Sequence, residues 1–167
     1  AFENAIMIVL AMGGSTNAVL HLLAMAHEAR VTLTIDDFDR LSSCTPYLTD
    51  LRPGGQFVMS DVGKSGGIPV IMKELLKIGL LHGDALTVTG KTIAENLESF
   101  DGYPDRRVIY PASSPRSPVG GLVILKGNLA SEGAVLKIAG TKHLTHEGPA
   151  RVFDGERAAF NAVTKNR

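Results

Sequence analysis

A polar turn between two strongly apolar segments limits the fold of this chain more than any other feature. Residues 2–12 and 17–30 are apolar on nearly all sides, which predicts two helices that are buried on several sides. Between them, residues 13–17 read Gly-Gly-Ser-Thr-Asn. Either glycine can adopt the left-handed conformation that ends a helix, and the serine or the threonine can cap the next helix. The pattern predicts a helical hairpin whose turn either caps itself or faces a ligand.

Further elements are indicated by capping residues, prolines and glycines. Capping-box spacing predicts helices that begin at Thr34 and at Thr92. Another helix is predicted over residues 70–78, because Pro69 suits a first helical turn. Residues 85–89 are a candidate for a short strand. The first hundred residues are therefore expected to be mostly helical with little strand.

The composition changes at residues 111–118, which contain three prolines and three serines. Such a segment is typical of a linker. Beyond it, residues 122–125, 135–138 and 151–153 predict strands, and residues 156–163 predict a helix. We therefore expect an α/β chain with three parts: a mainly helical part (1–112), a linker (113–118) and the beginning of a β-rich domain (119–167).

Charge and cysteine content exclude several functions. The chain has 17 basic and 17 acidic residues and no basic run, so capture of nucleic acid or of an anionic membrane is not expected. Its most apolar run, residues 5–12, is too short to cross a bilayer. The single cysteine, Cys44, excludes an intrachain disulfide and fits a reducing compartment such as the cytoplasm. The apolar start at Ala1 is typical of a segment cut from a longer protein.

Many stretches, in order, resemble the dihydroxy-acid and phosphogluconate dehydratase family, and the resemblance spans essentially the whole chain. The similar stretches are residues 1–5, 13–24, 66–69, 79–84, 86–92, 120–122, 125–130, 132–137 and 148–153.

This resemblance implies that the chain is an internal segment of a hydro-lyase. Such an enzyme removes water from a 2,3-dihydroxy acid to give a 2-keto acid in valine and isoleucine biosynthesis. It implies an iron–sulfur cluster and Mg²⁺ in the full-length parent, a homodimer, and a β-barrel-like C-terminal domain. In the family, the cluster cysteines and magnesium ligands precede the part similar to this chain, and a serine base and a further acidic ligand follow it.

The chain itself lacks the residues for these cofactors. An iron–sulfur cluster needs several cysteine thiolates, and only Cys44 is present, outside the family's ligand motifs. We interpret Cys44 as a structural or incidental thiol that behaves as a small hydrophobe. We assign no catalytic residue and no metal ligand here. The isolated 167-residue chain is expected to bind neither cofactor and to be inactive.

Ser15, Thr16 and Asn17 are the candidate substrate-binding residues. A helix cap explains these residue types without any ligand. Backbone amides at a helix N-terminus also bind carboxylates, and the resemblance places this turn near the substrate pocket. His21 could support a ligand group through a hydrogen bond, although a satisfied core histidine is the commoner case.

Other polar clusters are better explained by structure. Three aspartates within residues 36–39 suit the start of a helix through its dipole. Residues 64–67, Lys-Ser-Gly-Gly, resemble an anion-binding turn but are equally expected at the entry to a helix. Three loop histidines have no partner at a metal-ligand spacing and are expected to be exposed: His82, His143 and His146.

Two classes of function stay open. One is a segment of a dehydratase, with residues 79–92 closer to the branched-chain enzyme and a phosphogluconate or aldonate dehydratase as the alternative. The other is a non-catalytic scaffold or oligomerisation module. Cluster cysteines upstream and a glycine-rich serine motif downstream in the gene would support the first.

Overall fold

Helices dominate the first hundred residues, and a two-stranded hairpin follows them. The structure is a computed structural model that describes residues 1–141 and 144–165. Its elements, in chain order, are α1 (Phe2–Ala11), α2 (Asn17–Glu28), α3 (Ile35–Cys44), α4 (Met59–Lys64), α5 (Ile68–Lys77), α6 (Ile93–Glu98), β1 (Leu122–Gly127), β2 (Ala130–Lys137) and α7 (Glu156–Thr164). The mixed helix and strand content confirms the predicted α/β class.

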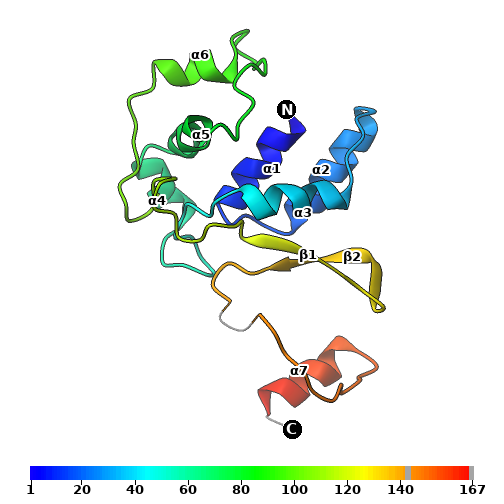
Figure 1. Cartoon of the computed structure of the whole chain (residues 1–167). Coiled ribbons are helices and arrows are strands. Elements are labelled where there is room, and N and C mark those ends of the chain that lie inside the picture. The colour runs from blue at the N-terminus through cyan, green and yellow to red at the C-terminus, as the bar shows by residue number, and fades with distance from the viewer. Residues whose placement is uncertain (142–143, 166–167) are drawn as a thin grey trace.

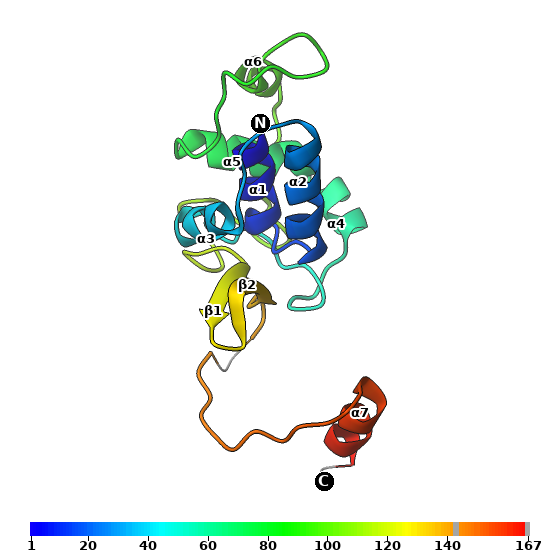
Figure 2. The ribbon, with the colours of Figure 1, turned by 90° about the vertical axis from the view of Figure 1, so that its right-hand side faces the viewer.

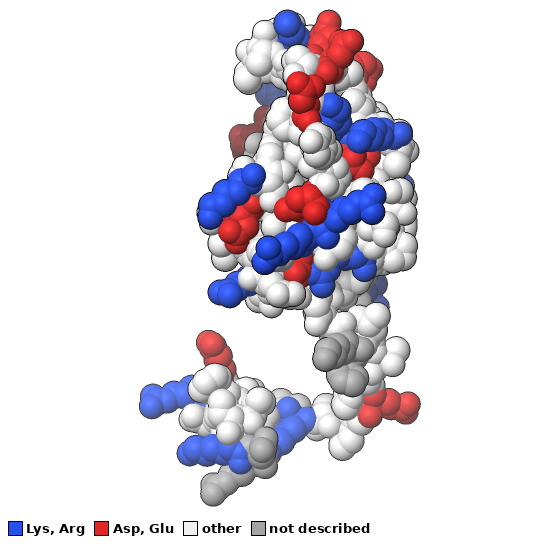
Figure 3. Space-filling model, turned by 90° about the vertical axis from the view of Figure 1, so that its left-hand side faces the viewer, with Lys and Arg blue, Asp and Glu red and all other residues white. Residues whose placement is uncertain are grey.

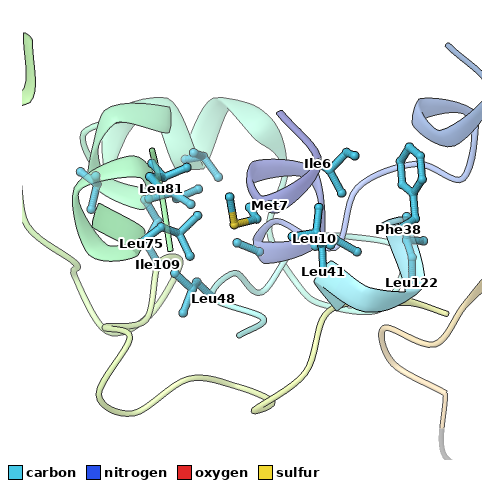
Figure 4. Close-up of a cluster of buried hydrophobic side chains, with 14 of the residues drawn as sticks. Ile6, Met7, Leu10, Phe38, Leu41, Leu48, Leu75, Leu81, Ile109 and Leu122 are labelled. Carbon is cyan, nitrogen blue, oxygen red and sulfur yellow. The ribbon is translucent and has the colours of Figure 1, made fainter. Parts of the chain in front are cut away.

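Helix α1 is the centre of the core. It contacts α2, α3 and α5, and Figures 1 and 2 show it among these helices. Ile6, Met7 and Leu10 of α1 are at most 1% exposed. Figure 4 shows these side chains between Leu75 on one side and Phe38 on the other. Full burial of such side chains stabilises a fold by about 1.5–3 kcal/mol each, so α1 holds the two sides of the core together.

Helix α2 differs from its prediction. The sequence predicts burial on several sides, but only Val19 and Ala26 are buried. Leu20 and Met25 are 65% and 58% exposed. Helix α2 contacts only α1 and α3 among the elements with substantial contacts, so the structure offers its outer side no partner within the described residues.

Both predicted capping boxes are present. The carboxylate of Asp37 accepts a hydrogen bond from Thr34 N at 2.9 Å, and that of Glu95 accepts one from Thr92 N at 2.7 Å. These bonds satisfy N–H groups that helix geometry leaves free, and the carboxylates favour the positive end of the helix dipole. The Asp37 bond also supports the structural interpretation of the acidic cluster.

The hairpin is antiparallel, with Leu122 opposite Lys137. It contacts α3 through β1, as the views in Figures 1 and 2 show. Ser42 Oγ donates to Leu122 O, and Gly120 N donates to Ser42 O at 2.9 Å. Leu122 is 2% exposed and belongs to the main core, so the hairpin packs on the helical part.

Two predicted strands are absent and one helix was missed. Residues 85–89 form a turn with an isolated bridge from Leu86 to Thr92, because the Thr87 hydroxyl donates to Lys91 O and draws the chain back. Residues 151–153 are not in a strand and pair with nothing in the described structure. Helix α4 was not predicted, because it is only six residues long and contains Gly63.

The proline-rich segment 111–118 lies against the helical part. Tyr47 N donates to Ser117 O, and Arg116 N donates to Tyr47 O, both at 3.0 Å. The Arg116 guanidinium forms an ion pair with Asp50, which is 3% exposed. These bonds hold the segment in place, while the proposed division at 113–118 stays a prediction.

Helix α7 lies apart from the rest of the chain in Figures 1 and 2, and none of its residues is buried. None of the helices in residues 1–141 and 144–165 has the length and apolar character that crossing a membrane requires.

Candidate functional site

The glycine-rich turn ends α1 as predicted. Gly13 has a φ of 60°, and its N–H donates to Leu10 O at 3.1 Å, while Gly14 N donates to Val9 O at 2.8 Å. This pair of bonds is the Schellman motif, in which a left-handed residue closes a helix. A Cβ atom on Gly13 would also lie 2.5 Å from Cε2 of Tyr47. Both backbone conformation and space therefore require glycine here.

The hydroxyl groups of the turn do less capping than predicted. Thr16 is the N-cap residue of α2, but its side chain accepts no capping hydrogen bond and its φ and ψ are helical, at −58° and −26°. Ser15 Oγ instead accepts a hydrogen bond from Asn17 N at 3.2 Å. Of the two hydroxyls, only that of Ser15 accepts a backbone hydrogen bond from the first turn of α2, and that of Thr16 makes no capping bond.

Close contacts at two glycines bring distant segments together beside this turn. A Cβ atom on Gly121 would lie 2.8 Å from Gly13 Cα and 3.3 Å from Ala139 Cβ, and one on Gly54 would lie 2.3 Å from Ala139 O. Only residues without a side chain allow backbones to approach this closely. The turn, the loop around Gly54 and the end of β2 therefore meet.

A pocket of about 530 Å³ lies where these segments meet. Its polar lining comes from Ser15 and Thr16 of the turn, from Arg52, and from Lys137 at the end of β2. Asn17 is exposed and is not among the lining residues. Binding of substrate by Ser15, Thr16 and Asn17 stays a prediction.

Arg52 and Lys137 are the site residues that sequence reasoning missed. They are far apart in the chain, and neither belongs to a recognisable ligand motif. The available signal was the glycine near each of them, at positions 54 and 140, which marks close backbone approach.

The second candidate turn, residues 64–67, has a structural role. Gly67 precedes α5 with a φ of 79°, and Ser65 Oγ donates to Asp105 at 2.7 Å. Lys64 lies 3.8 Å from Asp61. The carboxylates of Asp105 and Asp61 therefore lie beside the polar groups of this turn, and their negative charge would repel an anion there.

Asp105 organises the neighbouring loop. Partial burial raises the pKa of its carboxyl, but hydrogen bonds to the carboxylate outweigh that effect and lower the pKa from 3.8 to about 2. The donors are the N–H groups of Ile109, Arg107 and Val108 and the hydroxyl of Ser65.

The other candidates are exposed. His21 is exposed, so its interpretation as a core histidine is wrong. Cys44 is exposed, with its Sγ 3.3 Å from Leu41 O. His82 is exposed as expected, and its Nε2 lies 2.7 Å from Glu3 Oε2. His146 is exposed as expected, whereas His143 lies outside the described residues.

No group of three or more His, Cys, Asp or Glu side chains within residues 1–141 and 144–165 could hold a metal ion. The single thiol of the chain, Cys44, does not fit an iron–sulfur cluster, which needs several cysteine ligands.

Charges of both signs alternate over the surface. Figure 3 shows Lys and Arg side chains interspersed with Asp and Glu on the face that it draws. This mixture matches a formal net charge of zero. Recognition at the pocket must therefore depend on local groups rather than on a field of one sign.

Comparisons with known proteins cover the whole chain. The family model described as dihydroxy-acid/6-phosphogluconate dehydratase N-terminal matches residues 1–96, and the C-terminal model of the same family matches residues 107–167.

Relatives named dihydroxy-acid dehydratase support the match. The protein of Nocardioides sp. is 62% identical over 98% of this chain and 29% of its own length. Those of Leifsonia xyli and Sulfurisphaera tokodaii are 59% and 54% identical over 100% of this chain and 30% of their own length. The chain thus spans about 30% of the length of the curated relatives it matches. The chain belongs to the dihydroxy-acid/6-phosphogluconate dehydratase family.

Proposed function

We propose that this chain is a segment of a dihydroxy-acid dehydratase. The complete enzyme is a hydro-lyase that breaks the C–H bond at C2 and the C–O bond at C3 of a 2,3-dihydroxy acid. Water leaves, and the resulting enol becomes a 2-keto acid, as in valine and isoleucine biosynthesis. The observation that carries this proposal is 54–62% identity to proteins of that name over 98–100% of the chain.

The contribution of this chain is substrate binding. Ser15 and Thr16 line the pocket, and Asn17 lies next to them at the start of α2. Their hydroxyl and amide groups suit the hydroxyl and carboxylate oxygens of a dihydroxy acid. Lys137 and Arg52 add positive charge to the same pocket.

The cofactors belong to other parts of the polypeptide in this proposal. The family resemblance indicates an iron–sulfur cluster and Mg²⁺, but no group of three or more His, Cys, Asp or Glu side chains gathers among the described residues, and the only thiol is Cys44. We assign the ligands of both to flanking sequence.

The proposal includes the organisation of the enzyme. Residues 1–112 complete an N-terminal α/β domain, residues 113–118 connect it, and residues 119–167 begin a β-barrel-like C-terminal domain. The enzyme is a homodimer of the cytoplasm. The resemblance to the family and, for the compartment, the single cysteine support these assignments.

Turnover measurements test the function. The complete polypeptide and the isolated 167-residue chain are each given a branched 2,3-dihydroxy acid and 6-phosphogluconate, and the 2-keto acid is measured together with protein-bound iron. We expect the complete polypeptide to convert the branched acid in preference, and the isolated chain to bind no stoichiometric iron and to be inactive. Preference for 6-phosphogluconate would establish the alternative substrate, and no turnover of either would favour a scaffold module.

A further inference from the structure

The pocket beside the glycine-rich turn contains two cationic side chains and no acidic one. Arg52 and Lys137 line it, and none of its other lining residues is Asp or Glu. Within the described part of the chain, neither cation has a carboxylate within ion-pair distance. An anion placed in this pocket would therefore face only attractive charges.

Arg52 is held so that part of its guanidinium stays free. Its backbone N donates to Phe57 O at 2.9 Å, and its Nε donates to Gln56 O at 3.1 Å. No described residue accepts a hydrogen bond from its two terminal nitrogens, so both remain to donate. A planar guanidinium suits a carboxylate, which can accept two parallel hydrogen bonds from it.

Lys137 occupies the end of β2 on the same strand face as Val135, which packs against the core. Its side chain is half-buried, and this burial lowers the pKa of the ammonium group. A partly desolvated cation without a partner costs free energy, and a bound carboxylate would offset that cost.

The rest of the pocket suits the other end of a small acid. Met12, Leu51 and Met59 supply apolar lining. Apolar side chains favour a hydrocarbon tail over a polyhydroxylated or phosphorylated one.

Four other pockets formed by the described residues do not share this character. Acidic side chains line three of them, represented by Glu74, Glu3 and Asp105. The remaining one contains Arg116, whose charge is already paired with Asp50.

We propose that Arg52 and Lys137 together bind the carboxylate of the dihydroxy acid, with Met12, Leu51 and Met59 beside its hydrocarbon tail. This assignment rests on the proposed function. It makes the two cations substrate-binding residues that set which end of the acid enters the pocket.

Variants of the complete polypeptide test the assignment. Lys137→Met and Arg52→Met keep an apolar stem and remove the charge, Arg52→Lys keeps the charge without the planar fork, and Lys91→Gln alters an exposed loop lysine as the control. The readouts are kcat, KM and the calorimetric Kd of the 2-keto acid product, with melting temperatures to verify folding. Each charge-removing variant is expected to raise KM and Kd about tenfold or more, with a smaller change in kcat. Arg52→Lys should lie between wild type and Arg52→Met.

The carboxamide analogue of the product separates charge recognition from general damage. Wild type should bind the analogue about tenfold or more weakly than the acid, and the Lys137→Met and Arg52→Met variants should discriminate less. If the wild type is active and the folded variants bind the product with a Kd within about twofold of the wild-type value, the carboxylate assignment alone is overturned. If the wild type turns over neither acid, the proposed function is overturned. If the wild type then still binds the 2-keto acid, and both Arg52→Met and Lys137→Met weaken that binding, the assignment of an anion site to these two residues stands.

Discussion

A Cβ atom on Gly140 would lie 2.5 Å from Gly54 Cα, so the loop after Arg52 touches the end of β2 backbone to backbone. Gly140 also has a backbone φ of 83°, which residues other than glycine rarely adopt. This contact fixes the distance between the segments that carry Arg52 and Lys137. The shape of the pocket thus depends on Gly54 and Gly140, which are not among its lining residues.

Gly54→Ala tests that contact without adding backbone strain. Its Cβ would lie 2.3 Å from Ala139 O, a backbone atom that cannot move away alone. The free energy of unfolding should fall by about 1–3 kcal/mol, measured by chemical denaturation. Gly63→Ala in α4 is the control, because nothing lies within 4 Å of its Cβ position and alanine favours a helix. Equal stability of Gly54→Ala and wild type would contradict the close contact.

Asn4→Leu should destabilise the chain through the backbone of His82. Asn4 is 3% exposed, its Nδ2 donates to His82 O at 3.0 Å, and its Oδ1 accepts from His82 N at 2.8 Å. Leucine would leave both backbone groups without these partners, at about 1–3 kcal/mol for each group that water cannot reach. Denaturation of Asn4→Leu beside Asn161→Leu, an exposed position on α7, measures the difference. The prediction fails if both variants lose the same small amount.

Asp105→Asn should show a pH-dependent loss of stability. The folded pKa of about 2 lies below the ordinary 3.8, so the ionised carboxylate stabilises the folded state fully above about pH 4. That contribution is lost as the pH falls from about 4 through 2. The melting temperature of Asp105→Asn should therefore lie below that of wild type at neutral pH and approach it in acid.

Asp101→Asn is the matched control for this pH profile, since Asp101 is an exposed aspartate four residues earlier. Its melting temperature should follow that of wild type throughout. A constant gap between Asp105→Asn and wild type from pH 7 to about pH 2 would show that the side-chain amide disturbs packing rather than removing a favourable charge.

Local sequence signals predicted the elements that local interactions stabilise. The capping boxes at Thr34 and Thr92 and the left-handed Gly13 depend on neighbours within a few residues, and all three are present. The strand predicted at residues 85–89 is absent because the Thr87 hydroxyl donates to the backbone carbonyl of Lys91 and stabilises a turn instead. The prediction that α2 is buried on several sides was wrong, because the apolar content of a helix does not say which element covers it.

The cationic part of the site depends on tertiary contacts instead. Arg52 and Lys137 line the same pocket because Gly54 contacts Gly140 and Gly121 contacts Gly13. No periodicity or motif spacing in one sequence encodes such a pair. The turn at residues 13–17 was found because its polar residues interrupt two apolar helices.

The final prediction separates capping from substrate binding at that turn in the complete enzyme. Ser15→Ala removes the acceptor for Asn17 N and should lower the free energy of unfolding by about 1 kcal/mol, and if Ser15 only caps the helix its kinetics should stay nearly unchanged. Thr16 makes no capping bond through its side chain, so Thr16→Ala should leave stability within about 0.5 kcal/mol of wild type.

Kinetics then decide the role of Thr16 and Asn17. If this turn faces the substrate, Thr16→Ala or Asn17→Ala lowers kcat/KM about tenfold, or about 1.4 kcal/mol of transition-state stabilisation, at unchanged iron content. Thr32→Ala, at an exposed threonine after α2, should change neither quantity. Because Thr16 lines the pocket and its side chain makes no capping bond, a kinetic loss there would report contact with the ligand. Unchanged kinetics in both the Thr16 and Asn17 variants would leave the turn as scaffold.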